Sequence, residues 1–248
     1  MRLVPLLLVM TALGPFPGAA APEPRPLDTL EPRPGPERFP AHPHPQEQRV
    51  MSSQESLALH EWARRHLEET EATRESTGHH LPTELERLRA MYFLSVEDRS
   101  WVGSAWELLE NLEGRLTEGS PEGVILEAYR GALEVVRAKH ARWPPTKLSH
   151  LREGVGILDR LVEEGPVNLE VRYLRLVSCY YLPFFFKRGE SVREDFRVLV
   201  AELPRHPEAF SPAVYRGVVE FVLDKGEPAE RDRALLREAV TPGRDLSP

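Results

Sequence analysis

The chain has 248 residues, enough for one large or two small domains, and its 41% hydrophobic content is enough to form a buried core. Acidic residues outnumber basic ones by 39 to 32, and the net charge of -7 argues against a nucleic-acid partner because phosphate backbones repel an acidic surface. A single cysteine excludes an internal disulfide framework and a metal site built from several thiolates.

The first residues have the composition of a secretory signal peptide. Arg2 provides a positive start, an apolar run extends from Leu3 to Leu13, and small residues continue to Ala20. This pattern predicts a signal peptide over residues 1–20 and export of the mature protein to a bacterial periplasm or to the outside medium. The run is too short to span a bilayer, and no later stretch is apolar enough, so we expect no integral membrane segment after cleavage.

A proline-rich stretch follows the predicted signal. Nine prolines lie between residues 22 and 45, with few apolar residues among them. Proline lacks an amide donor and little apolar surface is available, so residues 21–51 are predicted to form a disordered linker. Residues 242–248 are predicted to be a flexible tail, and residues 52–241 a helical repeat domain.

From residue 52 onward, apolar residues recur at spacings of three and four, and no stretch alternates between apolar and polar residues as a strand does. We therefore predict an all-α fold of stacked antiparallel helix pairs. The predicted helices cover residues 53 to about 70, 82–94, 95–118, 121–141, 146–164, 169–182, 191–203, 211–225 and 228–240, the third beginning with Ser95 and Asp98 as a capping pair.

Tyrosines recur in the first helix of each predicted pair. Tyr92, Tyr129, Tyr173 and Tyr215 are separated by 37, 44 and 42 residues. Periods of this length are typical of helix-pair repeats. An irregular helical bundle, which also needs aromatic residues in its core, is the alternative architecture.

One segment resembles the second half of a tetratricopeptide repeat. Gly154, Leu158, Leu161 and Pro166 follow the family's spacing, although Leu161 stands where the family has a small residue. The Tyr-x-Gly segments at 129–131 and 215–217 are similar to the family's first helix, with its Gly and Tyr in reversed order. The chain thus resembles an exported tetratricopeptide-like protein with degenerate repeats.

The resemblance implies a function as well as a fold. In the family, first-helix residues line a concave surface on which a peptide or protein partner lies. The arginines in the corresponding helices are predicted to hold acidic groups of such a partner, or else to form salt bridges with neighbouring Glu residues of their own chain. They are Arg130, Arg172, Arg175 and Arg216.

The sequence holds no Gly-x-Ser-x-Gly elbow, phosphate-binding loop or dinucleotide fingerprint, which favours a non-catalytic protein without a cofactor or metal ion. The alternative is a cell-envelope hydrolase or small-ligand-binding protein with a site near residues 140–159. Its site would be assembled from His140, His150, Glu153 and Asp159.

Three further features have expected structural roles. The adjacent pair His79 and His80 is the best remaining metal candidate, but loop histidines of this kind are usually solvated. Cys179 lies in an apolar stretch and is expected to be buried and unreactive. The run of Phe184, Phe185 and Phe186 is expected to be buried between repeats rather than exposed to a partner.

Overall fold

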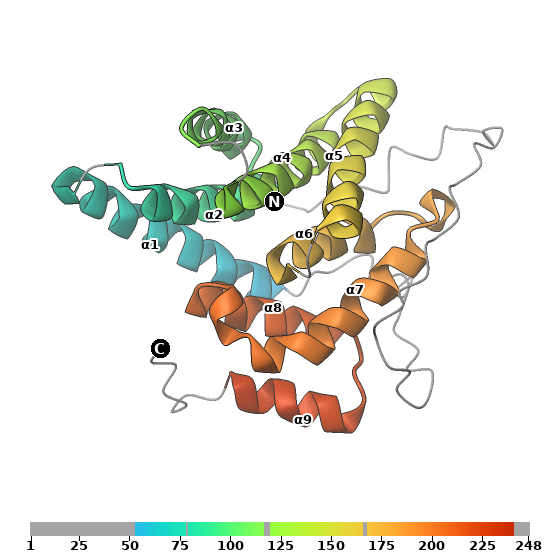
Figure 1. The fold of residues 1–248 in the computed structure, drawn as a ribbon. Helices are drawn as coiled ribbons and strands as arrows, with labels where there is room; N and C mark the ends of the chain where they lie inside the picture. Colours follow the sequence, from blue (N-terminus) through green and yellow to red (C-terminus); the bar gives the residue numbers. More distant parts are fainter. Residues whose placement is uncertain (1–52, 78, 117–119, 166–167, 241–248) are drawn as a thin grey trace.

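The computed structural model describes residues 53–77, 79–116, 120–165 and 168–240, and within these ranges it is α-helical without strands (Figure 1). The all-α fold predicted from the hydrophobic periodicity is thereby confirmed. The helices are α1 (Ser53–Thr77), α2 (Leu81–Glu97), α3 (Ser100–Glu113), α4 (Pro121–His140), α5 (Pro144–Glu164), α6 (Leu169–Tyr180), α7 (Gly189–Glu202), α8 (Pro212–Lys225) and α9 (Glu230–Ala239), with short 3-10 turns η3 (Phe184–Phe186), η4 (Leu203–Arg205) and η5 (Pro207–Ala209).

Proline and polar caps divide the chain into short helices. Proline lies in the first turn of α2, α4, α5 and α8, where the missing amide would have had no helical partner. The side chain of Asn168 caps α6, since its Oδ1 accepts from the amides of Glu170 and Val171 at 3.0 and 3.1 Å. These signals place most helix ends within a few residues of the predicted ones.

Helices α4 and α5 cross at very close range. A Cβ atom added to Gly154 would lie only 2.4 Å from the carbonyl oxygen of Gly131. One turn along the pair, Glu134 of α4 meets His150 of α5. Residue numbers rise on one helix as they fall on the other, so the two helices run antiparallel.

The four recurring tyrosines are all buried in the core. Tyr92, Tyr129, Tyr173 and Tyr215 are 7% exposed or less. The rings of Tyr92 and Tyr129 meet edge to face at 5.4 Å, and the ring of Tyr173 meets that of Phe221 at 6.0 Å. Aromatic contacts therefore join α2 to α4 and α6 to α8.

A buried polar cluster also joins α2, α4 and α6. Arg89 of α2 donates from Nε and Nη2 to the two carboxylate oxygens of Glu170 in α6, at 2.7 and 2.6 Å. The hydroxyl of Tyr129 in α4 donates to the same carboxylate at 2.8 Å. Burial, followed by the charge of Glu170, raises the pKa of Tyr129, so this hydroxyl stays protonated. The cluster ties three helices together.

Helix α1 lies along α2 and also contacts α8, so it connects two parts of the stack that are distant in sequence (Figure 1). The ring of Trp62 meets that of Phe93 in α2 edge to face at 5.9 Å. Further along α1, an ion pair joins Glu71 to Arg87 of α2. The first helix is thus anchored over much of its length.

Two predicted boundaries were wrong. Helix α1 continues through the polar run to Thr77, because Thr70 is buried and donates to the carbonyl of His66 at 2.8 Å. Ser95 does not cap α3: it is buried inside α2 and donates to the carbonyl of Tyr92 at 2.7 Å. It is Asp98 that accepts from the amide of Ser100 at the start of α3, at 2.9 Å.

The predicted signal peptide (1–20), the linker (21–51) and the tail (242–248) lie outside the described residues. Within the described part of the chain, every helix is too short or too polar to cross a membrane.

Candidate functional site

Arg172 and Arg175 lie together on α6 and face α7. Arg175 donates from Nε and Nη2 to the two oxygens of Asp195, at 2.8 and 2.7 Å. Arg172 donates from Nη1 to Asp195 at 3.2 Å and to Glu194 at 3.0 Å. The side chain of Arg175 is 4% exposed and that of Asp195 is fully buried. This network therefore holds two helices together inside the protein.

The charge state of this network follows from its geometry. Burial by itself would lower the pKa of Arg175, but the hydrogen bond and the charge of Asp195 outweigh burial and raise this pKa. The guanidinium is therefore held in its charged form. An acidic group of a partner would have to displace Asp195 to reach it, and would leave a buried carboxylate unpaired.

Arg130 lies on a different part of the molecule. It donates from Nε to Glu113 of α3 at 2.8 Å, and its guanidinium lies 5.0 Å from the ring centre of Trp106. The hydrogen bond that Arg130 donates to Glu113 raises the pKa of Arg130 despite partial burial. Its side chain is 31% exposed, so it is accessible only in part.

Arg216 is exposed on α8 and forms an ion pair with none of the acidic residues that the structure describes. The structure therefore brings Arg172 and Arg175 together and places Arg130 and Arg216 apart from them, on α4 and α8. Three of the four arginines have carboxylate partners within the chain. Arg216 alone of the four is exposed.

The four residues predicted for the alternative site lie in three different places in the structure. His140 lies with Nε2 at 2.8 Å from the carbonyl oxygen of Ser95, at the end of α2. Asp159 pairs with Arg188, and its Oδ1 accepts from Arg175 at 3.5 Å. The other two, His150 and Glu153, lie close together on α5.

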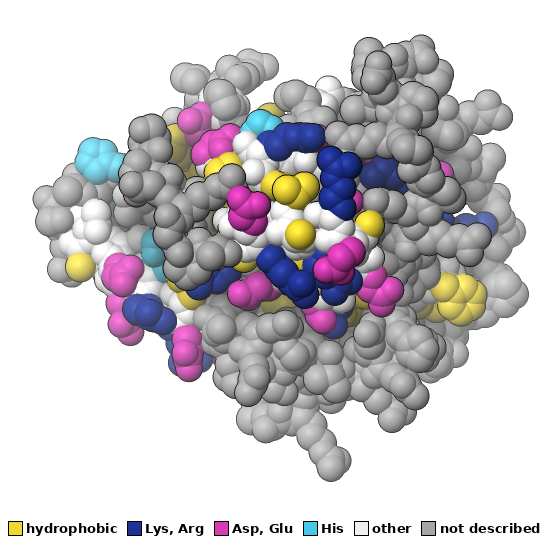
Figure 2. Space-filling view, turned by 90° about the horizontal axis from the view of Figure 1, so that it is seen from below, with side chains coloured by type: hydrophobic (Ala, Val, Ile, Leu, Met, Phe, Trp, Pro, Cys, Tyr) yellow, Lys and Arg dark blue, Asp and Glu magenta, His cyan; other side chains and the backbone are white. Residues whose placement is uncertain are grey.

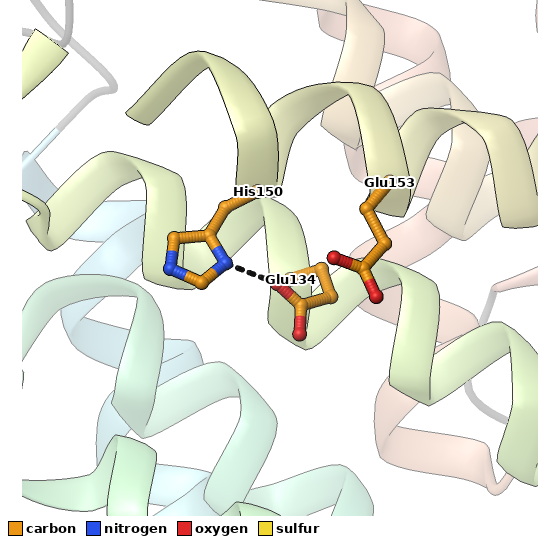
Figure 3. Close-up of side chains that lie close together, drawn as sticks. All are labelled: Glu134, His150 and Glu153. Atoms are coloured by element: carbon orange, nitrogen blue, oxygen red, sulfur yellow. Dashed lines mark hydrogen bonds and ion pairs between the residues drawn. The ribbon is translucent and has the colours of Figure 1, made fainter. Parts of the chain in front are cut away.

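Glu134 of α4 joins His150 and Glu153 in a compact cluster (Figure 3). His150 and Glu153 project from the same helix toward Glu134, and one ligand atom from each of the three lies within 4.8 Å of the others. His150 donates from Nδ1 to Oε2 of Glu134 at 2.6 Å, and Arg137 donates to its Oε1 at 2.7 Å. Glu134 is 3% exposed, whereas Glu153 is exposed.

Glu134 was not among the residues predicted from the sequence. The sequence indicates its position only indirectly. Glu134 is one turn from Gly131 on α4, and His150 is one turn from Gly154 on the antiparallel α5. Had the close contact of the two glycines been assumed, the register would have placed Glu134 against His150. His79, the other candidate histidine, lies 2.8 Å from Glu84 at the start of α2.

The aromatic run after α6 is more exposed than expected. Phe184 and Phe185 are 78% and 50% exposed, whereas Phe186 packs against a small apolar cluster of α4, α5 and Leu182. The expected burial was therefore wrong for the first two. The 3-10 turn η3 is followed by Lys187 with φ of 55°, a left-handed residue that turns the chain into α7 and leaves the two rings outside the core.

The surface is otherwise shallow and mixed in charge. A depression lined by Leu161, Val162, Asn168, Val171 and Arg172 encloses no volume that a water-sized sphere could occupy, so it does not form a ligand pocket. On the face turned downward in Figure 1, basic and acidic side chains of the described residues are interspersed (Figure 2). This face has the character of ordinary solvated surface.

The chain matches no family model, and neither a curated protein nor a solved structure is significantly similar to it.

Proposed function

We propose that the protein is an exported, non-catalytic helical-repeat module that binds a protein or peptide partner through the aromatic residues between α6 and α7. The observation that carries the proposal is the exposure of two adjacent rings, with Phe184 at 78% and Phe185 at 50%. Aromatic side chains are enriched among the residues that dominate binding energy, because each buries a large apolar area with few rotatable bonds.

The position of the two rings supports this role. The turn η3 is anchored at its two ends. Leu182, just before the turn, is 3% exposed, and Phe186, its last residue, packs against the apolar cluster. An exposed ring on a fixed support loses less conformational entropy on binding than one on a free loop. The partner surface that suits these rings is an apolar pocket or groove.

The tetratricopeptide-like interpretation belongs to the same proposal. It draws support from the antiparallel α4–α5 pair, from the close contact at Gly154 where the repeat pattern calls for a small residue, and from the buried tyrosines of successive helices. Export draws its support from the sequence of residues 1–20.

Of the arginines predicted to hold a partner, Arg216 fits that role most readily because it is exposed. The other three would have to exchange a carboxylate of their own chain for one of the partner. The alternative function, a hydrolase or small-ligand-binding protein with a site near residues 140–159, draws support from the Glu134–His150–Glu153 cluster. It lacks support from a deep pocket in the described part of the chain.

Panning of a displayed peptide library against the immobilised protein tests the proposal. Selected peptides are expected to bind the wild-type chain and to lose at least about 10-fold in affinity for a Phe184→Ser/Phe185→Ser variant, which corresponds to about 1.4 kcal/mol. Leu235→Ser is the matched control, because Leu235 is a 43% exposed apolar residue of α9.

Equal loss in the control and the double variant would contradict the assignment of the aromatic pair. A separate Arg216→Glu variant tests whether this side chain contributes. If it weakens binding by a similar factor while circular dichroism is unchanged, the partner surface extends from the aromatic pair to α8.

A further inference from the structure

We propose that Glu134, His150 and Glu153 form a binding site for a single divalent transition-metal ion, with Zn²⁺ as the best match. The proposal is independent of peptide binding and goes beyond it. One imidazole and two carboxylates supply one nitrogen and two oxygen donors. Zinc is commonly held by three such protein ligands with a water molecule in the fourth position.

The three donors come from two helices whose separation is fixed. His150 and Glu153 are three residues apart on α5 and so share one face of that helix. The neighbouring contact of Gly131 with Gly154 holds α4 against this face. The ligand atoms therefore converge because of the helix crossing, and no flexible loop is needed to assemble them.

The distances are compatible with an ion after small side-chain movements. The three ligand atoms lie within 4.8 Å of one another, and His150 Nδ1 is 2.6 Å from Glu134 Oε2. Tetrahedral ligation with bonds of about 2.0–2.2 Å places ligand atoms about 3.5 Å apart. The short pair has to open and Glu153 has to approach, and both follow from rotation of exposed or half-buried side chains.

The imidazole must also change its tautomer. Nδ1 now donates a hydrogen to Glu134, and an ion between the two groups takes the place of that proton. The neutral ring then carries its proton on Nε2.

The basic groups near the cluster do not block it. Arg137 donates to Oε1 of Glu134 and leaves Oε2 directed at His150, the arrangement of an outer residue that orients a ligand. Two carboxylates and this one guanidinium leave the site with a net negative charge. Lys147, one turn before His150, directs its amine to the carbonyl oxygen of Lys139 at 3.4 Å.

Glu153 distinguishes a metal site from a purely structural pair. The His150–Glu134 hydrogen bond would by itself link α4 to α5, and it does not require a third group. Glu153 is exposed and forms an ion pair with none of the basic residues that the structure describes, although it points toward Glu134 (Figure 3). Glu153 therefore supplies a third ligand atom that the His150–Glu134 link does not use.

Titration of the EDTA-treated protein with ZnCl2 by isothermal calorimetry tests the proposal. We expect one Zn²⁺ per chain in the wild type and at least about 10-fold weaker binding in Glu153→Gln and in His150→Gln. Glu163→Gln is the matched control for the first, since Glu163 is an exposed acid of the same helix, and His206→Gln is the control for the second. Both controls should bind as the wild type does.

Two results would overturn the proposal. One is a wild-type chain that binds no Zn²⁺ beyond the level of the Glu153→Gln variant. The other is equal weakening in the two cluster variants and the two controls, which indicates dispersed surface binding. Because Glu153 is exposed, its substitution leaves the fold intact, and a loss of binding in that variant cannot be attributed to unfolding. Peptide affinity measured with and without Zn²⁺ shows whether peptide binding at the aromatic pair is independent of metal binding at the cluster.

Discussion

The α4–α5 pair and the α6–α7 pair are held together by different physical means. In the first, two glycines let the backbones meet, and a Cβ on Gly154 would lie 2.4 Å from the Gly131 oxygen. In the second, Asp195 at 0% exposure binds Arg172 and Arg175 between the helices. Beside the glycine contact, Glu134, His150 and Glu153 lie close enough together to bind a ligand. In the α6–α7 pair, the arginines bind a carboxylate of their own chain instead.

The connections of the two pairs differ as well. Helix α5 begins four residues after α4 ends, whereas nine positions separate the end of α6 at Tyr180 from the start of α7 at Gly189. The longer connection contains η3 and presents Phe184 and Phe185 to solvent. The charge-linked pair thus carries the surface proposed to bind a partner, and the glycine-linked pair carries the proposed metal site.

The largest expected effect is on the charge-linked pair. Asp195→Ala leaves two guanidinium groups without their buried partner, so we expect the free energy of unfolding to fall by about 3–5 kcal/mol. Denaturant titration measures the change. Glu194→Gln is the control, because the side chain of Glu194 is 31% exposed, and it should lower stability by about 1 kcal/mol or less.

An Asp195→Ala protein as stable as the wild type would show that the network does not hold α6 to α7. The α4–α5 and α6–α7 pairs would then not differ in the way proposed.

The next largest effect concerns the glycine crossing. Gly154→Ala places a methyl group against the backbone of α4, and the helices must separate, so we expect a loss of about 3 kcal/mol. Gly156→Ala lies on the same helix with nothing within 4 Å of the added Cβ, and it should stabilise the protein by about 0.5–1 kcal/mol. Thermal unfolding followed by circular dichroism compares the two. Similar behaviour of both variants would rule out the close crossing.

A smaller effect is predicted from the pKa of Cys179 in α6. Burial raises the pKa of this thiol to about 11, so the folded protein retains a proton that the unfolded chain loses near pH 9. The contribution to stability is therefore complete below pH 9 and is lost as the pH rises toward 11. We expect the wild type to lose roughly 1–3 kcal/mol relative to Cys179→Ala across this range.

Unfolding free energies of both chains at pH 8, 9.5 and 10.5 provide the measurement. The ionisation of buried tyrosines is shared by the two chains and cancels in the difference. Identical pH dependence in the two chains would mean that the thiol is not buried in its neutral form.

Much of the fold was predictable from the sequence because helix boundaries depend on local signals. Proline in first helical turns placed the start of α4 correctly, and the tyrosine period identified core positions, all four of which are buried. The polar end of α1 was missed because Thr70, a polar residue, is buried and its hydroxyl bonds back within the helix. Ser95 was misassigned because its hydroxyl bonds back within its own helix.

The candidate sites were less predictable, since they depend on which helices meet. The sequence singled out Arg172 and Arg175 but gave no sign that Asp195, on another helix, lies between them. It likewise proposed His150 and Glu153 without Glu134. Phe184 and Phe185 resemble core residues by composition, but they lie in a 3-10 turn between α6 and α7 and remain exposed.

The proposed binding surface is tested by measuring both stability and peptide affinity in one variant, Phe184→Ser/Phe185→Ser. Because both rings are exposed, the free energy of unfolding should change by no more than about 0.5 kcal/mol. Affinity for a peptide selected on the wild-type chain should fall at least about 10-fold, or about 1.4 kcal/mol. A destabilised variant that keeps its full peptide affinity would show that the aromatic pair serves packing, and would contradict the proposed binding surface.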